Sequence, residues 1–393
     1  MKKLAVITSG RADYGLVRPI MKGISRSKKL ELQVFVTGAH LSPDYGNTHK
    51  EIEADGFVID ERIQSMRRTD TPEDVARSMG LTTQGFSKAF ARTRPDMILV
   101  LGDRYEIFAA ASAAVAMGIA IAHVHGGETT VGSVDEIFRH CLTKMSHLHF
   151  VSCEQYANRV IQLGEEPWRV TVSGAPGLDN FKDFTPYSPG EFRKKFDIPI
   201  RDDFLMVTFH PESVHPEHTR YQIETILSAL ENIHRPLVFT YPNEDAAGKT
   251  IIRALRRYCI SHDEAWLAVS LGTRGYASLM SRASAMVGNS SSGIIEAASF
   301  KLPVVNIGIR QQGRLKPQNV LDAPTELNAI IKAINKAISP SFRSLLRNLK
   351  NPFGDGRAVS RIIRVIEQSE LNETFLLKRF HDLKQRQGAL QCG

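Results

Sequence analysis

Carboxylates and histidines gather between residues 103 and 135. Asp103 directly follows the apolar run MILVL, His125 and Glu128 lie in AHVHGGETT, and Asp135 lies in VDEIFRH. Carboxylates and imidazoles transfer protons near neutral pH, and they shift each other's pKa when they meet in one pocket. This spacing predicts an acid–base site. A plain alternative for Asp135 is an i,i+4 ion pair with Arg139 on a helix surface.

A second candidate site lies in the segment VGNSSSGIIE, whose pattern predicts a strand end, a Gly/Ser-rich turn and a helix start. Backbone N–H groups at a helix start and the hydroxyls of Ser290, Ser291 and Ser292 suit a diphosphate. Glu296, one to two turns later, is positioned to reach a ribose hydroxyl. The alternative is a serine-rich N-cap that only stabilises the helix.

Other polar side chains follow predicted strands and could address phosphate oxygens. They are Arg11 in SGRADYG, His210 in FHPES, Asn243 in YPNED, and Arg310 and Arg314 in IRQQGR. Arginine forks and histidines bind phosphate well, although exposed arginines are often simply solvated. The first of these turns is not G-x-G-x-x-G, which argues against NAD.

The order of elements predicts how these groups are positioned. Short β-rich runs alternate with helical segments, the pattern of parallel βαβ units, in which ligands bind beyond the carboxyl ends of the strands. We therefore expect an α/β protein with two Rossmann-like domains, residues 1–180 and 181–365, whose parallel sheets face a central cleft. A helical tail over 366–393 could pack back on the first domain. The expected strands are Leu4–Thr8, Leu32–Thr37, Met97–Leu101, Ala120–Val124, His149–Val151, Val170–Ser173, Phe204–Phe209, Leu237–Tyr241, Ala268–Leu271, Ala285–Val287 and Val304–Ile307.

Composition excludes several classes of function. The chain has 393 residues, a net charge of +8 and four cysteines without metal-site spacing. Its basic residues form no long run, so no nucleic-acid partner is expected, and the excess charge suits a small polyanion. No stretch reaches the roughly 20 apolar residues of a membrane-spanning helix. We therefore expect a cytoplasmic protein with no membrane partner, no metal and reduced thiols.

Nine motifs in this order resemble a known family. They are SGRADYG, TGAHLSPDYG, GDRYE, HVHGGE with VDEIFRH, FHPES, YPNED, GNSSSGIIEA, GIRQQGR and NPFGDGRA. Over residues 1–365 the chain is similar to the hydrolysing UDP-N-acetylglucosamine 2-epimerases of sialic acid synthesis. It equally resembles the related enzymes that act on N,N'-diacetylbacillosamine nucleotides for legionaminic acid. The resemblance implies the two-domain GT-B fold.

The resemblance also implies a reaction and roles. Anti elimination of the C2 proton and the nucleoside diphosphate leaves a glycal, and water then adds to release the free 2-epimerised sugar. The anion clamp maps to Arg11, His210 and the serines 290–292, Glu296 maps to the ribose contact, and Asp103 and Asp135 map to acid–base residues. No cofactor is implied, the partner is a nucleotide sugar, and a homodimer or higher homo-oligomer is expected.

The chain departs from this family at His125. Many relatives carry Glu in a H-x-E-G-G pattern where this chain has His123-Val-His-Gly-Gly-Glu128. Either His125 takes the catalytic role, or Glu128 supplies the carboxylate, or the altered pocket marks another sugar; we favour the third combined with the first. The choice between UDP and GDP stays open. A GT-B glycosyltransferase and a nucleotide-sugar sensor without turnover are the alternatives, because fold alone does not decide function.

Overall fold

The computed structural model describes residues 1–43, 46–65, 71–129, 134–200, 203–212, 216–242 and 247–383. It divides into two compact units. Unit 1 comprises Met1–Glu128, Ile137–Gly174 and Val359–Gly393, and unit 2 comprises Thr129–Glu136 and Ala175–Ala358. Apart from the short segment Thr129–Glu136, the chain passes from unit 1 to unit 2 after residue 174, where the sequence suggested 180. It returns to unit 1 at residue 359, where the sequence suggested a tail from 366.

Unit 1 is built on a parallel sheet. Within the described residues its seven strands run in the order β3-β2-β1-β4-β5-β6-β7. The central strands β4 and β5 have five residues each, and all of these residues are buried, as expected of a parallel sheet covered on both faces. The strands are β1 (Lys2–Thr8), β2 (Leu30–Val36), β3 (Glu61–Arg62), β4 (Met97–Leu101), β5 (Ala120–Val124), β6 (Leu148–Val151) and β7 (Val170–Val172).

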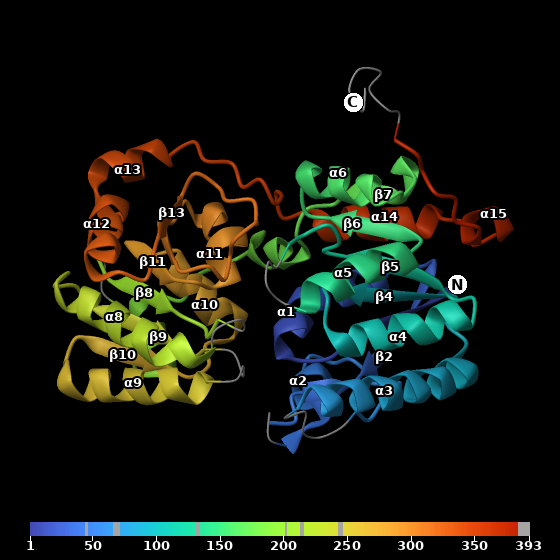
Figure 1. Cartoon of the computed structure of the whole chain (residues 1–393), viewed down its shortest axis with the longest axis horizontal. Coiled ribbons are helices and arrows are strands. Elements are labelled where there is room, and N and C mark those ends of the chain that lie inside the picture. Colours follow the sequence, from blue (N-terminus) through green and yellow to red (C-terminus); the bar gives the residue numbers. More distant parts are fainter. Residues whose placement is uncertain are drawn as a thin grey trace, which may run out of the picture. The chain divides into compact units, whose positions relative to one another are not determined.

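Helices cover both faces of this sheet. One core joins the sheet to α1 (Arg11–Arg26) and to α14 (Ala358–Gln368), which Figure 1 draws in red among the blue and green elements of unit 1. The other core joins it to α3 (Pro72–Thr93), α4 (Tyr105–Ala116) and α5 (Val134–Met145). The remaining helices are α2 (His49–Ala54), α6 (Glu154–Gln162) and α15 (Glu373–Leu376), with 3-10 turns at Gly38–Leu41 and Pro167–Arg169.

Unit 2 repeats this architecture with a parallel sheet of order β10-β9-β8-β11-β12-β13. One face packs on α8 (Thr219–Glu231), α9 (Gly248–Ser261) and α12 (Leu327–Ile338). The other packs on α7 (Pro189–Phe196), α10 (Gly272–Met280) and the turn after α11 (Ser291–Ile295). The strands are β8 (Leu205–Thr208), β9 (Leu237–Thr240), β10 (Ala265–Ala268), β11 (Ala285–Gly288), β12 (Val304–Ile307) and β13 (Val320–Ala323). Helix α13 (Pro340–Leu345) follows α12. The 3-10 turns cover Pro176–Phe181, Pro216–His218 and Ala297–Phe300.

The predicted strand Ala268–Leu271 is wrong in position. Strand β10 ends at Ala268, and Leu271 already precedes α10, because Gly272 adopts a φ of 60° and begins that helix. The strands β3 and β13 were not predicted at all. Both are short strands at a sheet edge, and they carry Glu61, Arg62 and Asp322, so no continuous apolar run indicates them. In the described part of the chain, no helix is long and apolar enough to cross a membrane.

Candidate active site

His125 and Glu128 form a buried pair just beyond the carboxyl end of β5. His125 Nδ1 lies 2.5 Å from Glu128 Oε1, and the two residues are 5% and 3% exposed. Ser152, which follows β6, donates to the same carboxylate oxygen at 3.1 Å. Because Nδ1–H faces the carboxylate, the neutral imidazole carries its lone pair on Nε2. That buried Nε2 has no hydrogen-bond partner among the described residues, so it is available to accept a proton.

The backbone at His125 supports a functional interpretation. Its φ is 65°, in the left-handed region that a histidine seldom adopts. Such strain costs on the order of 1–3 kcal/mol and clusters at active sites. The neighbouring turn is fixed by Gly127, where an added Cβ would lie 2.5 Å from the carbonyl oxygen of Tyr156. The loop therefore holds the imidazole in one place at the expense of local stability.

Asp103, just beyond β4, is tied to this pair through Arg139. The buried guanidinium of Arg139 donates through Nη2 to Asp103 Oδ2 and through Nη1 to the carbonyl oxygen of His125, at 3.0 Å for the latter. Arg139 thereby links the Asp103 side chain to the His125 loop. The sequence indicated Arg139 only as a surface partner of Asp135, and its burial could not be inferred from helical spacing.

The other histidine of the HVHGGE motif, His123, has a structural role in the sheet. His123 is fully buried in β5, and its Nε2 donates to the carbonyl oxygen of Gly102 at 2.8 Å. Burial lowers the pKa of His123 to about 3, which keeps the ring neutral at physiological pH. The structure therefore separates two histidines that sequence alone presents side by side.

Two further predicted residues lie in the first turns of helices. Asp135 is half-buried in the first turn of α5, in the short segment that groups with unit 2. Arg11 is exposed in the first turn of α1, and its Nη1 lies 4.0 Å from Glu51. Sequence reasoning instead missed Asp13 in the same motif. Its carboxylate accepts hydrogen bonds from the Ser9 N–H and Oγ, both at 2.8 Å, and so fixes the start of α1.

In unit 2, hydroxyl groups converge at the start of α11. Ser290 Oγ lies 2.9 Å from Ser292 Oγ, and Ser292 Oγ lies 2.6 Å from the hydroxyl of Tyr276. Tyr276 comes from α10, and no sequence pattern indicates that it joins the serines. Gly288 is required at the strand end, because a Cβ there would lie 1.9 Å from the carbonyl oxygen of Thr208. Ser291, beside them, is half-buried at the first residue of the helix.

His210 and Arg310 meet around Asn289. The His210 N–H donates to Asn289 Oδ1 at 2.7 Å, and Asn289 Nδ2 donates to the His210 carbonyl oxygen at 2.9 Å. Arg310 Nη1 donates to the Asn289 carbonyl oxygen at 3.2 Å. Burial, with a smaller contribution from Arg310, lowers the pKa of His210 to about 3. His210 is therefore neutral and suited to donating a hydrogen bond rather than supplying charge.

Two other residues of unit 2, Arg314 and Asn243, were predicted to contact the nucleotide. Arg314 Nε donates to the carbonyl oxygen of Thr129 at 3.2 Å. Asn243 lies outside the described residues. Glu212, which sequence reasoning passed over in FHPES, accepts from the Ile309 N–H at 2.8 Å and so joins the loops after β8 and β12. A φ of 80° at Gly308 lets the backbone approach that carboxylate.

Glu296, the predicted ribose contact, is half-buried beyond the end of α11, and burial raises its pKa to about 7. If its carboxylate accepts ribose hydroxyls, UDP should bind more tightly as the pH rises from 6 to 8. The gain should approach about tenfold, the difference between a neutral and a charge-assisted hydrogen bond. Calorimetric titration of UDP at several pH values checks this. In Glu296→Gln, the affinity for UDP should change with pH only as far as the ligand itself titrates. An equal change of affinity with pH in the unmodified protein and in this variant would contradict the assignment.

Known proteins are similar in sequence to this chain over nearly its whole length. A family model described as UDP-N-acetylglucosamine 2-epimerase matches residues 22–367. The chain is 39% identical to the Campylobacter jejuni GDP/UDP-N,N'-diacetylbacillosamine 2-epimerase (hydrolyzing), over 97% of this chain and 99% of that protein. It is 33% identical to the Legionella pneumophila UDP-N,N'-diacetylbacillosamine 2-epimerase (hydrolyzing), over 96% and 99%.

The fold comparison agrees with the family match. The crystal structure of the Neisseria meningitidis UDP-GlcNAc 2-epimerase bound to UDP-GlcNAc superposes with a TM-score of 0.79 at 19% identity, covering 94% of this chain and 100% of that one. This similarity shows a shared two-domain α/β fold of the GT-B type. Together with the family match over most of the chain, it confirms the resemblance inferred from the nine motifs. The chain belongs to the UDP-N-acetylglucosamine 2-epimerase family.

Proposed function

We propose that this protein is a hydrolysing nucleotide-sugar 2-epimerase whose substrate is a UDP- or GDP-linked N,N'-diacetylbacillosamine. The observation that carries the proposal is the buried cluster of His125, Glu128, Asp103 and Arg139 at the carboxyl ends of β4 and β5. Two relatives that match over nearly their full length bear diacetylbacillosamine epimerase names. UDP-N-acetylglucosamine is the alternative substrate, favoured by the family description.

His125 is the group that we assign to the C2 proton. In the elimination, the C2–H electron pair forms the C1=C2 bond, the C1–O bond breaks, and the nucleoside diphosphate leaves with its electron pair. The proton passes to Nε2, and Glu128 stabilises the resulting imidazolium through Nδ1–H, since the two atoms lie 2.5 Å apart. The role of the carboxylate is thus to orient the ring and to offset its new charge.

The hydration step needs a second set of proton transfers. Water adds its oxygen to C1 and loses a proton, while C2 receives a proton on the face opposite to the one that lost it. Inversion at C2 therefore requires more than one acid–base group. We assign Asp103 and Asp135 to this step, with the Asp103 side chain positioned by its hydrogen bond from Arg139.

We assign diphosphate binding to unit 2. The hydroxyls of Ser290, Ser291 and Ser292 and the guanidinium of Arg310 offer donors to phosphate oxygens, and neutral His210 adds another. Glu296 is assigned to the ribose. Arg11, Arg314 and Asn243 complete the set of proposed nucleotide contacts.

Proton NMR of the purified protein in D₂O tests the function. Each of UDP-N-acetylglucosamine and the UDP- and GDP-linked diacetylbacillosamines is supplied separately, and the release of free sugar and deuterium at C2 are followed. A free, C2-deuterated 2,4-diacetamido-2,4,6-trideoxymannose with nucleoside diphosphate supports the proposal, and N-acetylmannosamine would instead select the alternative substrate. Intact substrates without exchange at C2 would refute it and direct attention to glycosyl transfer.

Turnover is expected to persist in EDTA. Arginines, hydroxyls and a histidine supply enough donors for the diphosphate without a divalent ion. The initial rate in EDTA, supplied in large excess over contaminating metal, should therefore stay within about twofold of the untreated rate. A complete loss that Mg²⁺ restores would contradict the proposed clamp.

A further inference from the structure

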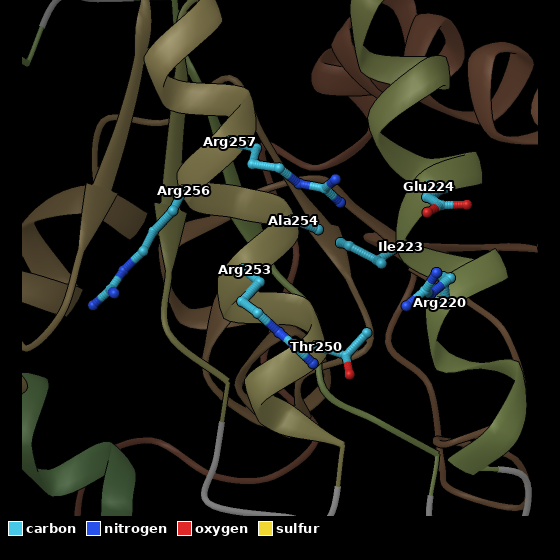
Figure 2. A pocket seen from close by; sticks show the side chains of 8 residues that line it. All are labelled: Arg220, Ile223, Glu224, Thr250, Arg253, Ala254, Arg256 and Arg257. Atoms are coloured by element: carbon cyan, nitrogen blue, oxygen red, sulfur yellow. The ribbon is translucent and has the colours of Figure 1, made fainter.

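A hollow of about 380 Å³ lies between α8 and α9 of unit 2, among residues that the proposed active site does not use. Its lining is rich in arginine from both helices, as Figure 2 shows: Arg220, Ile223, Glu224, Thr250, Arg253, Ala254, Arg256 and Arg257. The volume falls within the roughly 300–1,000 Å³ typical of small-molecule sites. The hollow is therefore large enough to hold a ligand of nucleotide size.

Three of its four arginines have no acidic partner. Among the described residues, no carboxylate forms a salt bridge with Arg220, Arg253 or Arg257. Figure 2 shows Arg253 from α9 extending beside Thr250 and Arg257 extending toward α8, with Arg220 on the α8 side of the hollow. Arg256 points to the other side of α9, where its Nη2 donates to the Tyr241 hydroxyl at 2.8 Å. Positive charge thus converges on the hollow from two helices.

Helix stability does not explain this arrangement. Arg253 and Arg257 are like charges at i,i+4 on α9, a spacing that destabilises a helix. Arg220 on the neighbouring helix adds a third charge, and Glu224 is the lone carboxylate in the lining. An anion between these guanidinium groups would remove the repulsion.

The base of the hollow has a different character. Ile223 and Ala254 are buried and belong to the core that joins α8 and α9 to the sheet. Arginine side chains also stack on flat rings through their planar guanidinium groups. The hollow therefore offers guanidinium planes for stacking as well as phosphate-binding forks and the Thr250 hydroxyl, which suits a ring attached to a phosphate better than a bare anion.

We propose that the hollow between α8 and α9 binds a nucleoside phosphate at a second site, separate from the proposed diphosphate loop. Arg220, Arg253 and Arg257 supply both the phosphate contacts and the planar groups on which the base stacks, and Thr250 donates to the phosphate. A nucleic-acid backbone is the less suitable ligand, because the cationic surface is a confined hollow rather than a long stripe. The proposal does not depend on which sugar the enzyme converts.

Calorimetric titrations of the full chain with UMP, GMP and inorganic phosphate at low ionic strength test this site. Arg220→Gln/Arg253→Gln removes two guanidinium groups from the hollow. The matched control Arg193→Gln/Arg343→Gln removes the same charge from exposed positions on α7 and α13. All four side chains are exposed, so we expect both double variants to fold. Thermal melting of each variant checks this.

The expected result is a second class of nucleotide sites in the unmodified protein and in the control. In the hollow variant, affinity for this second class should fall at least tenfold. UMP or GMP should bind there at least tenfold more tightly than inorganic phosphate. Equal binding by the two double variants would overturn the site. Equal affinity for phosphate and nucleotides would overturn the nucleotide assignment, and tighter binding of a dT12 oligonucleotide, lost in the hollow variant, would replace it by a nucleic-acid site.

Discussion

Replacement of Asp103 by Asn is expected to lower kcat by about 10²- to 10⁴-fold, the range that general acid–base groups contribute. Asn has nearly the same shape but neither takes nor carries a proton at neutral pH. The carboxylate lies just beyond β4 and is paired with Arg139, so the change also removes the charge partner of a buried guanidinium. UDP binding should stay within threefold of the unmodified protein, since the diphosphate donors that we propose come from unit 2.

Asp96→Asn provides a matched control for this prediction. Asp96 precedes the same strand at its amino end, is exposed, and accepts a hydrogen bond from the Lys3 N–H at 2.7 Å. Both changes remove one negative charge next to β4, but only Asp103 adjoins the His125 loop. Kinetics by D₂O NMR and UDP binding by calorimetry separate the two variants. Near-normal turnover in Asp103→Asn would take Asp103 out of the mechanism.

The Asp103→Asn variant could lose turnover because Arg139 moves or because proton transfer by Asp103 is removed, and a further variant distinguishes the two causes. Arg139 also donates to the His125 carbonyl oxygen, so its displacement could move the histidine loop. Arg139→Lys keeps a positive charge but cannot donate to both oxygens in the fork geometry of arginine. If proton transfer by Asp103 dominates, Arg139→Lys should retain more activity than Asp103→Asn.

Much of the fold could be predicted from the sequence because parallel sheets leave a clear pattern. Buried strands such as Met97–Leu101 and Val304–Ile307 are continuous apolar runs, and their ends are marked by Gly102 and Gly308, both with positive φ. The edge strands carry no such signal, since a strand that pairs on one side needs little apolar surface. The helical period from Arg361 onward suggested a tail that packs back on the first domain, but only three-dimensional packing shows that Ile362 and Ile366 are the side chains that join the core of unit 1.

The candidate site was predictable in its residue types but not in its pairings. The position of His125 and Glu128 after a strand predicted their place at the sheet end, because such loops carry function in α/β folds. The hydrogen bond between them was not predictable, because it depends on the left-handed φ of His125 within a two-glycine turn. Tyr276 and Arg139 were missed for a related reason: each lies on a helix whose periodicity reveals a buried face but not the polar atom that the side chain reaches.

Replacement of His125 by Asn is expected to lower kcat by about 10²- to 10⁴-fold and to abolish deuterium incorporation at C2. Asn is chosen because it is one of the few residues that tolerate a positive φ, here 65°, so the loop should keep its conformation. Its amide cannot act as a base. UDP binding should be retained, as for Asp103→Asn. If the His125→Asn variant retained more than a tenth of the turnover, His125 would not be the base.

Glu128→Gln is expected to give a smaller loss of about 10- to 100-fold, because the amide oxygen can still accept from Nδ1–H but cannot offset the charge of an imidazolium. The effect should appear in kcat, since the imidazolium loses the counter-charge that lies 2.5 Å from Nδ1. His125→Glu supplies the complementary comparison. It restores the H-x-E-G-G pattern of other family members, and it should retain more activity than His125→Asn if this position needs a base. Equal inactivity of the two variants would indicate that the pocket around residue 125 requires the imidazole itself, with the proton accepted by Nε2 of a ring already polarised by Glu128.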